Sequence, residues 1–357
     1  MIKVAINIKP LESGHKTRGI GYYITHLLNE LEKKDDVKVI QFREEKELAD
    51  IDVVHYPWFD FFFRSLPIKS KFPRVITVHD VIPLVFYKNY PSGIKGKINL
   101  VVQKIALNNS SLVITDSEAS KKDIKNYLGI NENKIDVVYL APDKTFKILK
   151  QTETLRLKMK YHLPDEFVLY VGDANYIKNL PFLLKGFIKL KAKNEHRNLK
   201  LVLIGQVFLK KAEYINHPEL QSLKEVLTLI EDQRLESEVI RPGFISDEEL
   251  TAFYNLATVY VQPSLYEGFG LPILQAFACG TPVVSSDAGS LTEVGGNAAV
   301  YFSPNNLEQF VKILEDVLIS SSLRKKISDL GKKQLEKFSW KKIADQTINS
   351  YEKAIKK

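Results

Sequence analysis

The sequence predicts an α/β protein built from two doubly wound parallel sheets. Two successive arrays of alternating strand and helix patterns carry this prediction, one ending near residue 140 and one starting near residue 167. Most of the expected strands are apolar at successive residues, as in FVLYV and TVYV, which is typical of strands covered on both faces. A chain of 357 residues also exceeds what one hydrophobic core usually serves. We therefore expect two Rossmann-like domains.

The first array is expected to form an amino-terminal domain over residues 1–160. Its expected elements in chain order are strand 2–8, a glycine loop ending in TRGIGYY, helix ITHLLNELEKK, strands VKVIQF, DVVHYP and RVITVHD, helix 95–110, strand SLVITDS, helix 121–128 and strand KIDVVYL. The polar, irregular segment 141–160 is the expected linker at the end of this domain.

The second array is expected to form a domain over residues 161–340. Its expected elements are FVLYVGD, helix 180–190, LKLVLIG, helix 220–232, EVIRPG, helix EELTAFYNLA, TVYVQPS, helix LPILQAFACG, and strands TPVVSS and AAVYF. The last helix, 341–357, is expected to pack back on the first domain. Folds of this kind bind ligands at the carboxyl ends of their strands.

Composition and charge narrow the function classes. No apolar run reaches the ~20 residues of a membrane helix, and MIKVAINIKP reads into a strand without a secretory signal. Cys279 is the single cysteine, so no internal disulfide forms and a cytoplasmic protein is expected. The net charge of +8 comes without zinc-finger spacing or an arginine-rich arm, which argues against nucleic acid. A lysine-rich solvated surface explains this charge, and peripheral contact with an anionic membrane face stays open.

The most informative motif is the segment PSLYEGFGLPILQAF. A strand runs into a glycine-bearing loop, and a helix follows whose first amides are free to bind phosphate. Gly268 and Gly270 allow a sharp turn and close approach of a ligand. Glu267 stands at the mouth of the loop and Gln275 lies one turn into the helix. A simple strand–helix turn with an exposed glutamate fits the same spacing equally well.

This segment resembles the signature of the retaining GT-B glycosyltransferases of family 4, in which two glutamates are separated by seven residues. In that family the first glutamate contacts the donor sugar's hydroxyls and the second hydrogen-bonds the nucleotide ribose. Glu267 matches the first, whereas Gln275 replaces the second. Because an amide accepts weaker hydrogen bonds than a carboxylate, weaker nucleotide binding is expected. The resemblance implies the GT-B fold, two Rossmann-like domains facing across a cleft.

The resemblance covers nearly the whole chain. Gly19 and Gly21 match a glycine loop that faces the donor phosphates and the acceptor, where Arg18 either adds charge or belongs to a simple turn. His79 follows an apolar strand and matches the histidine that reaches the donor sugar and the reacting centre, although a lone histidine is more often structural. Asp80 is expected to orient a neighbour.

Three further segments match. Lys178 corresponds to the lysine that neutralises the diphosphate, and it would carry more of that charge here because the family's usual arginine is absent. Gly243 and Phe244 would approach the base. In TDSEAS, Asp116 and the serines after it resemble a cleft segment but would also cap a helix. The donor-binding residues implied by the resemblance are Gly19, Gly21, Asp80, Gly243, Phe244, Gly268, Phe269, Gly270, Leu271 and Gln275.

The implied activity is retaining transfer of a sugar, first mannose from GDP-mannose and then UDP-sugars, to a glycan or lipid-linked acceptor in surface polysaccharide or glycoconjugate synthesis. Glu267 would hold the sugar, His79 the reacting centre and Lys178 the leaving diphosphate. No Asp-x-Asp motif is apparent, so neither a metal nor a cofactor beyond the nucleotide sugar is expected. The alternatives are a nucleotide-sugar epimerase, a glycan phosphorylase, and a non-catalytic subunit of the same fold. The oligomeric state stays open.

Overall fold

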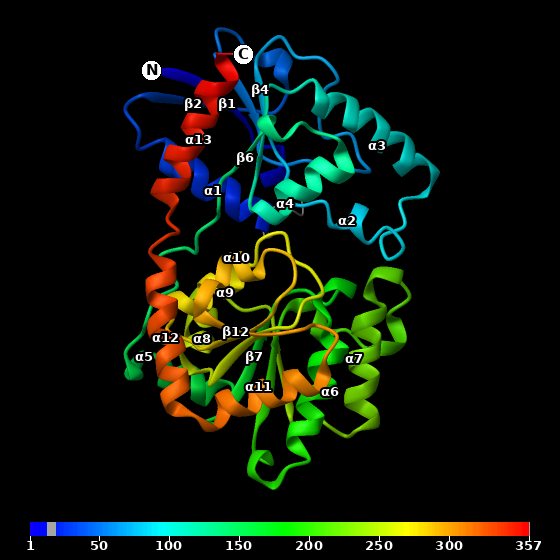
Figure 1. Ribbon diagram of the computed structural model, residues 1–357, viewed down its shortest axis with the longest axis vertical. Helices are drawn as coiled ribbons and strands as arrows, with labels where there is room; N and C mark the ends of the chain where they lie inside the picture. Colours follow the sequence, from blue (N-terminus) through cyan, green and yellow to red (C-terminus); the bar gives the residue numbers. More distant parts are fainter. Residues whose placement is uncertain (13–18, 357) are drawn as a thin grey trace. The chain divides into compact units, whose positions relative to one another are not determined.

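The structure is a computed structural model that describes residues 1–12 and 19–356 (Figure 1). Its contacts divide the chain into two compact units, Met1–Ala141 with Phe338–Lys357 (unit 1) and Pro142–Lys337 (unit 2). The first predicted domain ended at residue 160, so this boundary was placed too late. An irregular linker was expected over residues 141–160, but this segment contains helix α5 (Gln151–Lys160), which packs against helix α8 (Asp247–Leu256) of unit 2.

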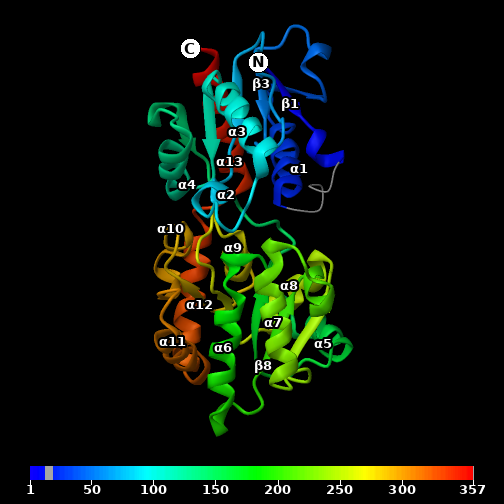
Figure 2. The same ribbon diagram turned by 90° about the vertical axis from the view of Figure 1, so that its right-hand side faces the viewer.

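Unit 1 contains a parallel six-stranded sheet in the order β2-β1-β3-β4-β5-β6. The strands are β1 (Ile2–Asn7), β2 (Val37–Phe42), β3 (Val53–Tyr56), β4 (Arg74–Thr77), β5 (Leu112–Thr115) and β6 (Ile135–Val137). Its helices include α1 (Gly19–Leu31), α2 (Ile82–Val85), α3 (Gly93–Asn108), α4 (Glu118–Asp123) and α13 (Trp340–Ile355). Helices lie on both faces of the sheet, as its apolar strands require (Figure 2).

The prediction that Gly19 and Gly21 lie in a loop before the first helix is wrong. Gly19 and Gly21 lie in the first turn of α1 rather than in a loop, and Gly21 is buried. Thr17 and Arg18, which belong to the same motif, lie outside the described residues.

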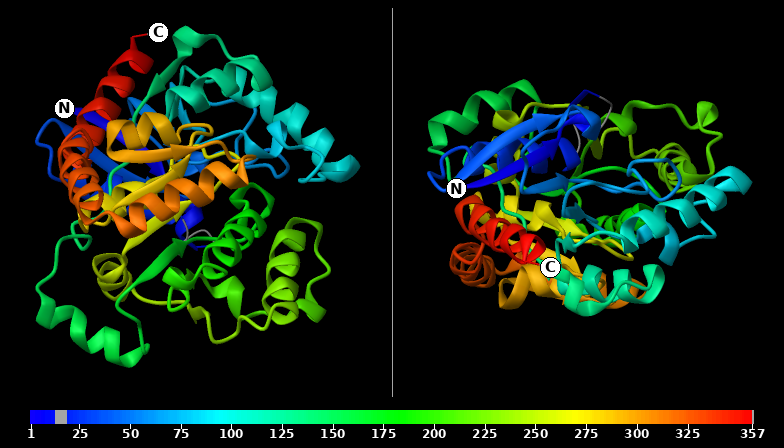
Figure 3. Two further views of the ribbon diagram at one scale, coloured as in Figure 1. Left: turned by 60° about the horizontal axis from the view of Figure 1, so that its bottom comes forward. Right: turned by 90° about the horizontal axis from the view of Figure 1, so that it is seen from above.

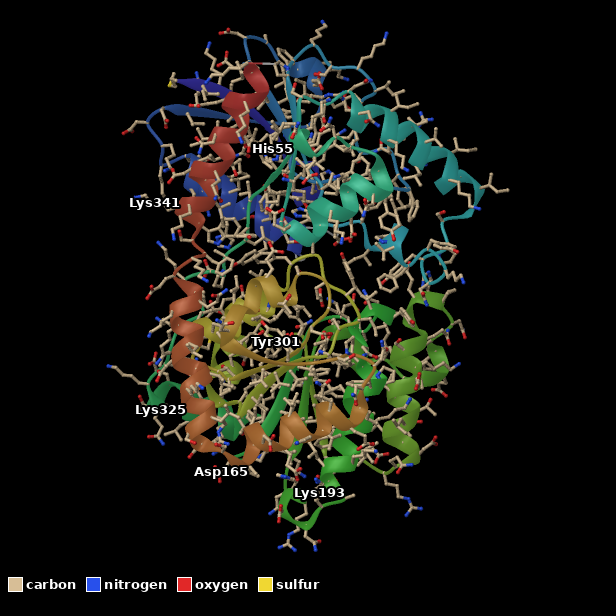
Figure 4. The ribbon with its side chains drawn as sticks, in the orientation of Figure 1. His55, Asp165, Lys193, Tyr301, Lys325 and Lys341 are labelled. Atoms are coloured by element: carbon tan, nitrogen blue, oxygen red, sulfur yellow. The ribbon has the colours of Figure 1, made fainter. Side chains whose placement is uncertain are left out.

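Helix α13 joins the end of the chain to unit 1, where it packs against α1 and strands β3 to β5. The buried ring of His55, labelled in Figure 4, has its Nδ1 2.8 Å from the Tyr351 hydroxyl of α13 and its Nε2 2.8 Å from the Thr77 hydroxyl. Ser350 donates a hydrogen bond of 2.7 Å to Asp136. Buried polar contacts of this kind fix the position of α13 on the sheet.

Unit 2 contains a second parallel sheet, in the order β12-β11-β10-β7-β8-β9. The strands are β7 (Phe167–Val171), β8 (Lys200–Ile204), β9 (Val239–Gly243), β10 (Val259–Gln262), β11 (Val283–Ser286) and β12 (Ala299–Phe302). The other helices include α6 (Leu180–Lys191), α7 (Gln221–Asp232), α9 (Leu271–Ala278), α10 (Leu291–Gly295), α11 (Leu307–Ile319) and α12 (Ser321–Leu335). The strand order reverses between β7 and β10, which makes this pair the switch point where such sheets bind ligands. Figure 3 shows the strands of this unit, coloured from green to orange, with helices beside them.

Helix α6 shows how the helices of unit 2 pack into its hydrophobic core. Helix α6 buries Leu180, Leu183, Leu184 and Phe187, which recur with the period of one helix face. Burying a side chain of this size stabilises the fold by roughly 1.5–3 kcal/mol. Gly186 lets α11 come close, because a Cβ there would lie 2.4 Å from the Phe310 ring.

Within the described residues, no helix combines the length and apolar character needed to cross a bilayer.

Candidate functional site

The switch point of unit 2 brings two of the three predicted catalytic residues together. Lys178 follows β7 in a short 3-10 helix, and Glu267 follows the neighbouring strand β10. The two loops are tied by a hydrogen bond of 2.7 Å from the Leu265 amide to the Ile177 carbonyl. Lys178 and Glu267 therefore meet at the carboxyl edge of the sheet, where both loops leave it, and they form an ion pair there.

The carboxylate of Glu267 is held by three donors. The Lys178 ammonium lies 2.8 and 2.9 Å from its two oxygens. The Ser264 hydroxyl and the Gln262 amide donate to Oε1 at 2.6 and 2.7 Å. The side chains of Lys178 and Glu267 are only 20% and 10% exposed, so the pair is largely removed from water. Because buried charges are costly unless paired, this network fixes the carboxylate in one position.

The loop after Glu267 and the segment that passes over it each require a glycine. Gly270, at φ +103°, precedes the first residue of α9, and a Cβ there would lie 2.7 Å from Leu291. Gly289, at φ +60°, passes so close that its Cβ would lie 2.6 Å from the Glu267 carbonyl oxygen. The Ser290 hydroxyl donates to the carbonyls of Glu267 and Phe269 at 3.0 and 2.7 Å. The loop is thus clamped against the segment that follows β11.

Within this loop the predicted donor-binding residues differ in exposure. Gly268 and Gly270 are buried, and Leu271 is half-buried in the first turn of α9. Phe269 is 5% exposed, so its side chain belongs to the core and only its backbone could meet a ligand.

Gln275 is half-buried and lies in the second turn of α9, as its spacing predicts. Its amide oxygen accepts a hydrogen bond of 3.2 Å from the Tyr254 hydroxyl. Burial raises the pKa of Tyr254 well above its usual 10, so this hydroxyl keeps its proton. A ribose hydroxyl would have to use the second lone pair of the Gln275 oxygen.

A glycine stands at the carboxyl end of each of three neighbouring strands: Gly172 follows β7, Gly205 follows β8, and Gly243 is the last residue of β9. A Cβ on Gly205 would lie 2.4 Å from the Gly172 carbonyl oxygen, and Gly243, at φ +82°, would place a Cβ 2.6 Å from Leu209. The Gly205 amide also donates to the Gly243 carbonyl at 3.2 Å. Phe244, just past β9, is 73% exposed. The sequence analysis predicted a role for Gly243 but not for Gly172 and Gly205, although each of these two directly follows an apolar strand. The three glycines together expose backbone at the carboxyl edge of the sheet.

In unit 1, His79 and Asp116 follow the neighbouring strands β4 and β5. His79 Nδ1 lies 2.8 Å from the Asp116 carboxylate, and Nε2 lies 3.3 Å from the Pro57 carbonyl oxygen. The ring meets Tyr23 edge-on, with 5.0 Å between centroids. The sequence also allowed Asp116 to cap the following helix, but the cap of α4 is Ser117. Its hydroxyl accepts a hydrogen bond from the Ser120 amide at 3.0 Å. Asp116 is thereby available to hold the histidine.

The surroundings of His79 favour its charged form. A carboxylate and a carbonyl only accept hydrogen bonds, and both ring nitrogens donate only when the ring is a cation. Burial by itself lowers the pKa of His79, but Asp116, through its charge and its hydrogen bond, and then Asp80 outweigh it and raise the pKa above 6.5. Asp80 also accepts a 2.9 Å bond from the Ile82 amide, which starts α2. Asp80 thus fixes the start of α2, and its role toward the donor stays a prediction.

Replacing Asp116 with asparagine should lower the pKa of His79 and cost about 1.5–3 kcal/mol of stability, as expected for a hydrogen bond to a charged group. Because the folded pKa is raised, this stability is fully present below about pH 6.5 and is lost as the pH rises through the folded pKa. The stability difference from the wild type should therefore be larger near pH 6 than near pH 9. An NMR titration of His79 with urea unfolding at both pH values measures these effects.

A second histidine, His55, makes the stability depend on pH in the opposite direction, and its effect must be distinguished from that of His79. Burial, followed by the charge of His79, lowers the pKa of His55 to about 3, so it destabilises the fold as the pH falls below about 6.5. Both proteins carry His55, so its effect largely cancels in the comparison. An unchanged pKa of His79 in Asp116→Asn would contradict the account.

One group of possible metal ligands occurs among the described residues: Glu195, His196 and Glu315. It precedes β8 and so lies at the amino edge of the sheet, opposite the Lys178–Glu267 pair. Lys193, labelled in Figure 4, already places its ammonium 2.7 Å from both carboxylate oxygens of Glu315. This group is not part of the candidate site.

A cavity of about 930 Å³ opens between α5 and α8, and it does not include the pair. Its walls carry both signs of charge, including Arg156, Lys160 and Glu249, of which the last two form an ion pair of 2.6 Å. We place the site at the switch point instead, because the buried, hydrogen-bonded carboxylate and the glycine-lined strand ends both lie there.

Comparison with known proteins fits this geometry. The profile of the family described as Glycosyl transferases group 1 matches residues 152–334, which include Lys178 and Glu267. The chain belongs to this family. The profile of Glycosyltransferase Family 4 matches residues 38–145, which include His79 and Asp116. The predicted membership of the group 1 glycosyltransferases is confirmed.

Relatives and solved structures extend this finding. The chain is 30% identical over 281 residues to the O-antigen chain mannosyltransferase B of Escherichia coli, covering 78% of this chain and 69% of that protein. It is 29% identical over 285 residues to the serotype-specific mannosyltransferase WbdA of Escherichia coli, covering 79% of this chain but only a third (33%) of WbdA. The structure of Anabaena Alr3699/HepE in complex with UDP and glucose superposes with a TM-score of 0.74 at 16% identity, covering 98% of this chain and 99% of that one. The predicted GT-B fold class is confirmed.

Proposed function

We propose that this group 1 family member is a glycosyltransferase that binds its nucleotide-sugar donor at the switch point of unit 2. The observation that carries the proposal is the buried pair of Lys178 and Glu267 at the junction of β7 and β10. The ammonium suits a diphosphate, and the carboxylate suits the hydroxyls of a sugar. Gly172, Gly205 and Gly243, at the carboxyl ends of β7, β8 and β9, offer backbone close to which a nucleotide can lie.

In the proposed reaction, the donor diphosphate competes with Glu267 for the Lys178 ammonium. The carboxylate oxygens released from Lys178 then accept hydrogen bonds from the sugar, while Ser264 and Gln262 keep the carboxylate in place. The bond between the anomeric carbon and the diphosphate oxygen breaks, and an acceptor oxygen bonds to the same carbon. The acceptor's proton passes to the departing phosphate. Lys178 and the positive amino-terminal end of α9 stabilise the negative charge of that leaving group.

The proposed donor is GDP-mannose, with UDP-sugars as the next choice, because two of the relatives are named as mannosyltransferases. The proposed acceptor is a glycan or lipid-linked glycan of surface polysaccharide synthesis at the cytoplasmic face of a membrane. Retention of the anomeric configuration and independence of metal ions belong to the proposal. The role of His79 at the reacting centre stays a prediction.

Release of GDP from GDP-mannose tests this function, with UDP-glucose as the comparison and with and without a mannose-containing acceptor. We expect GDP to appear only when acceptor is present, at the same rate with and without a chelator, and with the donor's anomeric configuration kept in the product. A donor at 100 times its Kd should also stabilise the fold by about 2.7 kcal/mol.

The alternatives give different results in the same assay. An epimerase would convert the donor sugar without acceptor and without releasing GDP, and a phosphorylase would need inorganic phosphate in place of a nucleotide sugar. A non-catalytic subunit would show neither turnover nor thermal stabilisation with any nucleotide sugar. Each of these results would overturn the proposed transferase activity.

A further inference from the structure

Helix α3 of unit 1 buries two polar side chains, Asn99 and Gln103, and exposes four large apolar ones. Its buried residues are Gly96, Asn99, Gln103, Ala106 and Leu107. Its exposed residues include Ile94, Ile98, Val101 and Ile105, which are 81%, 57%, 59% and 50% exposed. Surface helices normally direct such residues to the core, so this arrangement requires an explanation.

Polar contacts fix α3 in this orientation. The Asn99 amide donates to the Phe62 carbonyl at 2.8 Å. The Gln103 amide donates to the Ser65 hydroxyl at 2.6 Å and to the Asp60 carbonyl at 3.2 Å. Rolling the helix to bury its isoleucines would break these bonds and leave buried polar groups unpaired. The apolar side of α3 therefore stays directed away from unit 1.

The exposed apolar residues form one continuous stripe. They are spaced by four, three and four positions, so at 100° per residue they lie within an arc of about 60° on the helix. Tyr87, 66% exposed, joins the stripe at its start, because it lines a cavity of about 430 Å³ together with Ile94. Figure 1 shows α3 along the outer side of unit 1. We call Tyr87, Ile94, Ile98, Val101 and Ile105 the α3 apolar surface.

The charged residues of the segment that carries this surface are all lysines. Residues 81–115 contain Lys88, Lys95, Lys97 and Lys104 and no aspartate or glutamate. On the helix, Lys97 and Lys104 lie on one flank of the stripe and Lys95 on the other. Lysine side chains can extend past apolar groups to reach anionic headgroups while their stems cover apolar surface. An apolar stripe with a lysine on each flank matches a lipid surface with negative headgroups.

We propose that unit 1 binds anionic membranes through the α3 apolar surface, with α3 lying in the plane of the interface. The isoleucines enter the boundary between headgroups and acyl chains, and the lysines contact the phosphates. The inference does not depend on the transfer activity proposed above, since all the residues involved lie in α3 and the segment before it. The net charge of the chain allows peripheral contact with an anionic membrane, and this proposal places that contact on α3.

Co-sedimentation with vesicles tests the proposal. The full chain should bind phosphatidylcholine vesicles that contain phosphatidylglycerol, should bind pure phosphatidylcholine vesicles more weakly, and should be released by salt. Lys88→Gln/Lys95→Gln/Lys97→Gln should weaken binding about a hundredfold, at roughly fivefold for each charge. Ile94→Ser/Ile98→Ser/Ile105→Ser should weaken it at least tenfold. Serine and isoleucine have similar helix propensities, so these exposed changes should leave α3 folded.

Matched variants in unit 2 serve as controls. Lys325→Gln/Lys326→Gln/Lys333→Gln on α12 removes the same charge, and Met159→Ser/Tyr214→Ser/Ile319→Ser removes exposed side chains of similar size. Both should bind vesicles like the wild type. A tryptophan at position 98, introduced by Ile98→Trp, should shift its emission to the blue when anionic vesicles are added.

Three results would overturn the proposal. The first is a wild-type chain that does not bind anionic vesicles although its thermal melting shows a folded protein. The second is equal binding by the α3 variants and the controls. The third is a dimer, measured by light scattering, that Ile94→Ser/Ile98→Ser/Ile105→Ser converts to monomer without changing vesicle binding, because the surface would then serve a second copy of the chain.

Discussion

Replacing Glu267 with glutamine should lower kcat/KM for sugar transfer by about 10²–10³-fold while the protein stays folded. Hydrogen bonds to a charged group contribute ~1.5–3 kcal/mol each, against about 1 kcal/mol for neutral ones, so the loss of charge weakens every bond to the sugar's hydroxyls. Glutamine has nearly the same shape, and its oxygen can still accept from Ser264. Steady-state kinetics with GDP-mannose measure the effect.

The matched control for this variant is Glu225→Gln. Glu225 forms an ion pair of the same 2.8 Å length with Lys185, but both side chains are more than half exposed. Its kcat/KM should equal that of the wild type. If Glu267→Gln also keeps wild-type kcat/KM, the carboxylate does not hold the donor sugar, and the assignment of the site fails.

Replacing Lys178 with alanine should cost about 2–3 kcal/mol of unfolding free energy and weaken donor use by about ten- to a hundredfold. Breaking a buried ion pair typically costs 3–5 kcal/mol because the remaining charge is left unpaired. We expect less here, because Ser264 and Gln262 still donate to Glu267 and Lys178 is one-fifth exposed. Urea unfolding measures the stability, and the loss of one charge-assisted bond to the diphosphate accounts for the weaker donor use.

The comparison with Lys185→Ala makes this prediction specific. That lysine belongs to the exposed pair, whose loss should cost less than about 1 kcal/mol. Lys178→Ala/Glu267→Gln should recover part of the lost stability, because no uncompensated charge remains, but its activity should stay below that of Lys178→Ala. Equal stability losses for Lys178→Ala and Lys185→Ala would show that burial of the Glu267 pair has no energetic consequence.

The sequence predicted the two sheets well because both depend on local patterns. Strands that are apolar on both faces and helices with one apolar side are visible in short windows, as α6 illustrates. The start of α1 was predicted too late, because glycine has low helix propensity and Gly19 and Gly21 suggest a loop. Helix α5 was missed because it has few apolar residues and depends on packing against α8.

The contacts of the candidate site depend on strand order and could not be predicted from spacing. Lys178 and Glu267 were identified singly, but their ion pair joins loops 89 positions apart that meet only because β7 lies beside β10. Asp116 was interpreted as a helix cap or a cleft residue, and its bond to His79 follows from the pairing of β4 with β5. The apolar pattern of α3 locates a helix but does not show which side faces the sheet. Asn99 and Gln103 determine that side through partners on another segment.

The most direct test of the central claim is a calorimetric titration of GDP into the wild type, Lys178→Ala and Lys185→Ala. If the switch point of unit 2 holds the donor's diphosphate, the wild type and Lys185→Ala will bind GDP with the same Kd, and Lys178→Ala will bind it at least about tenfold more weakly. Equal affinity of all three proteins, or no binding by the folded wild type, would contradict the claim.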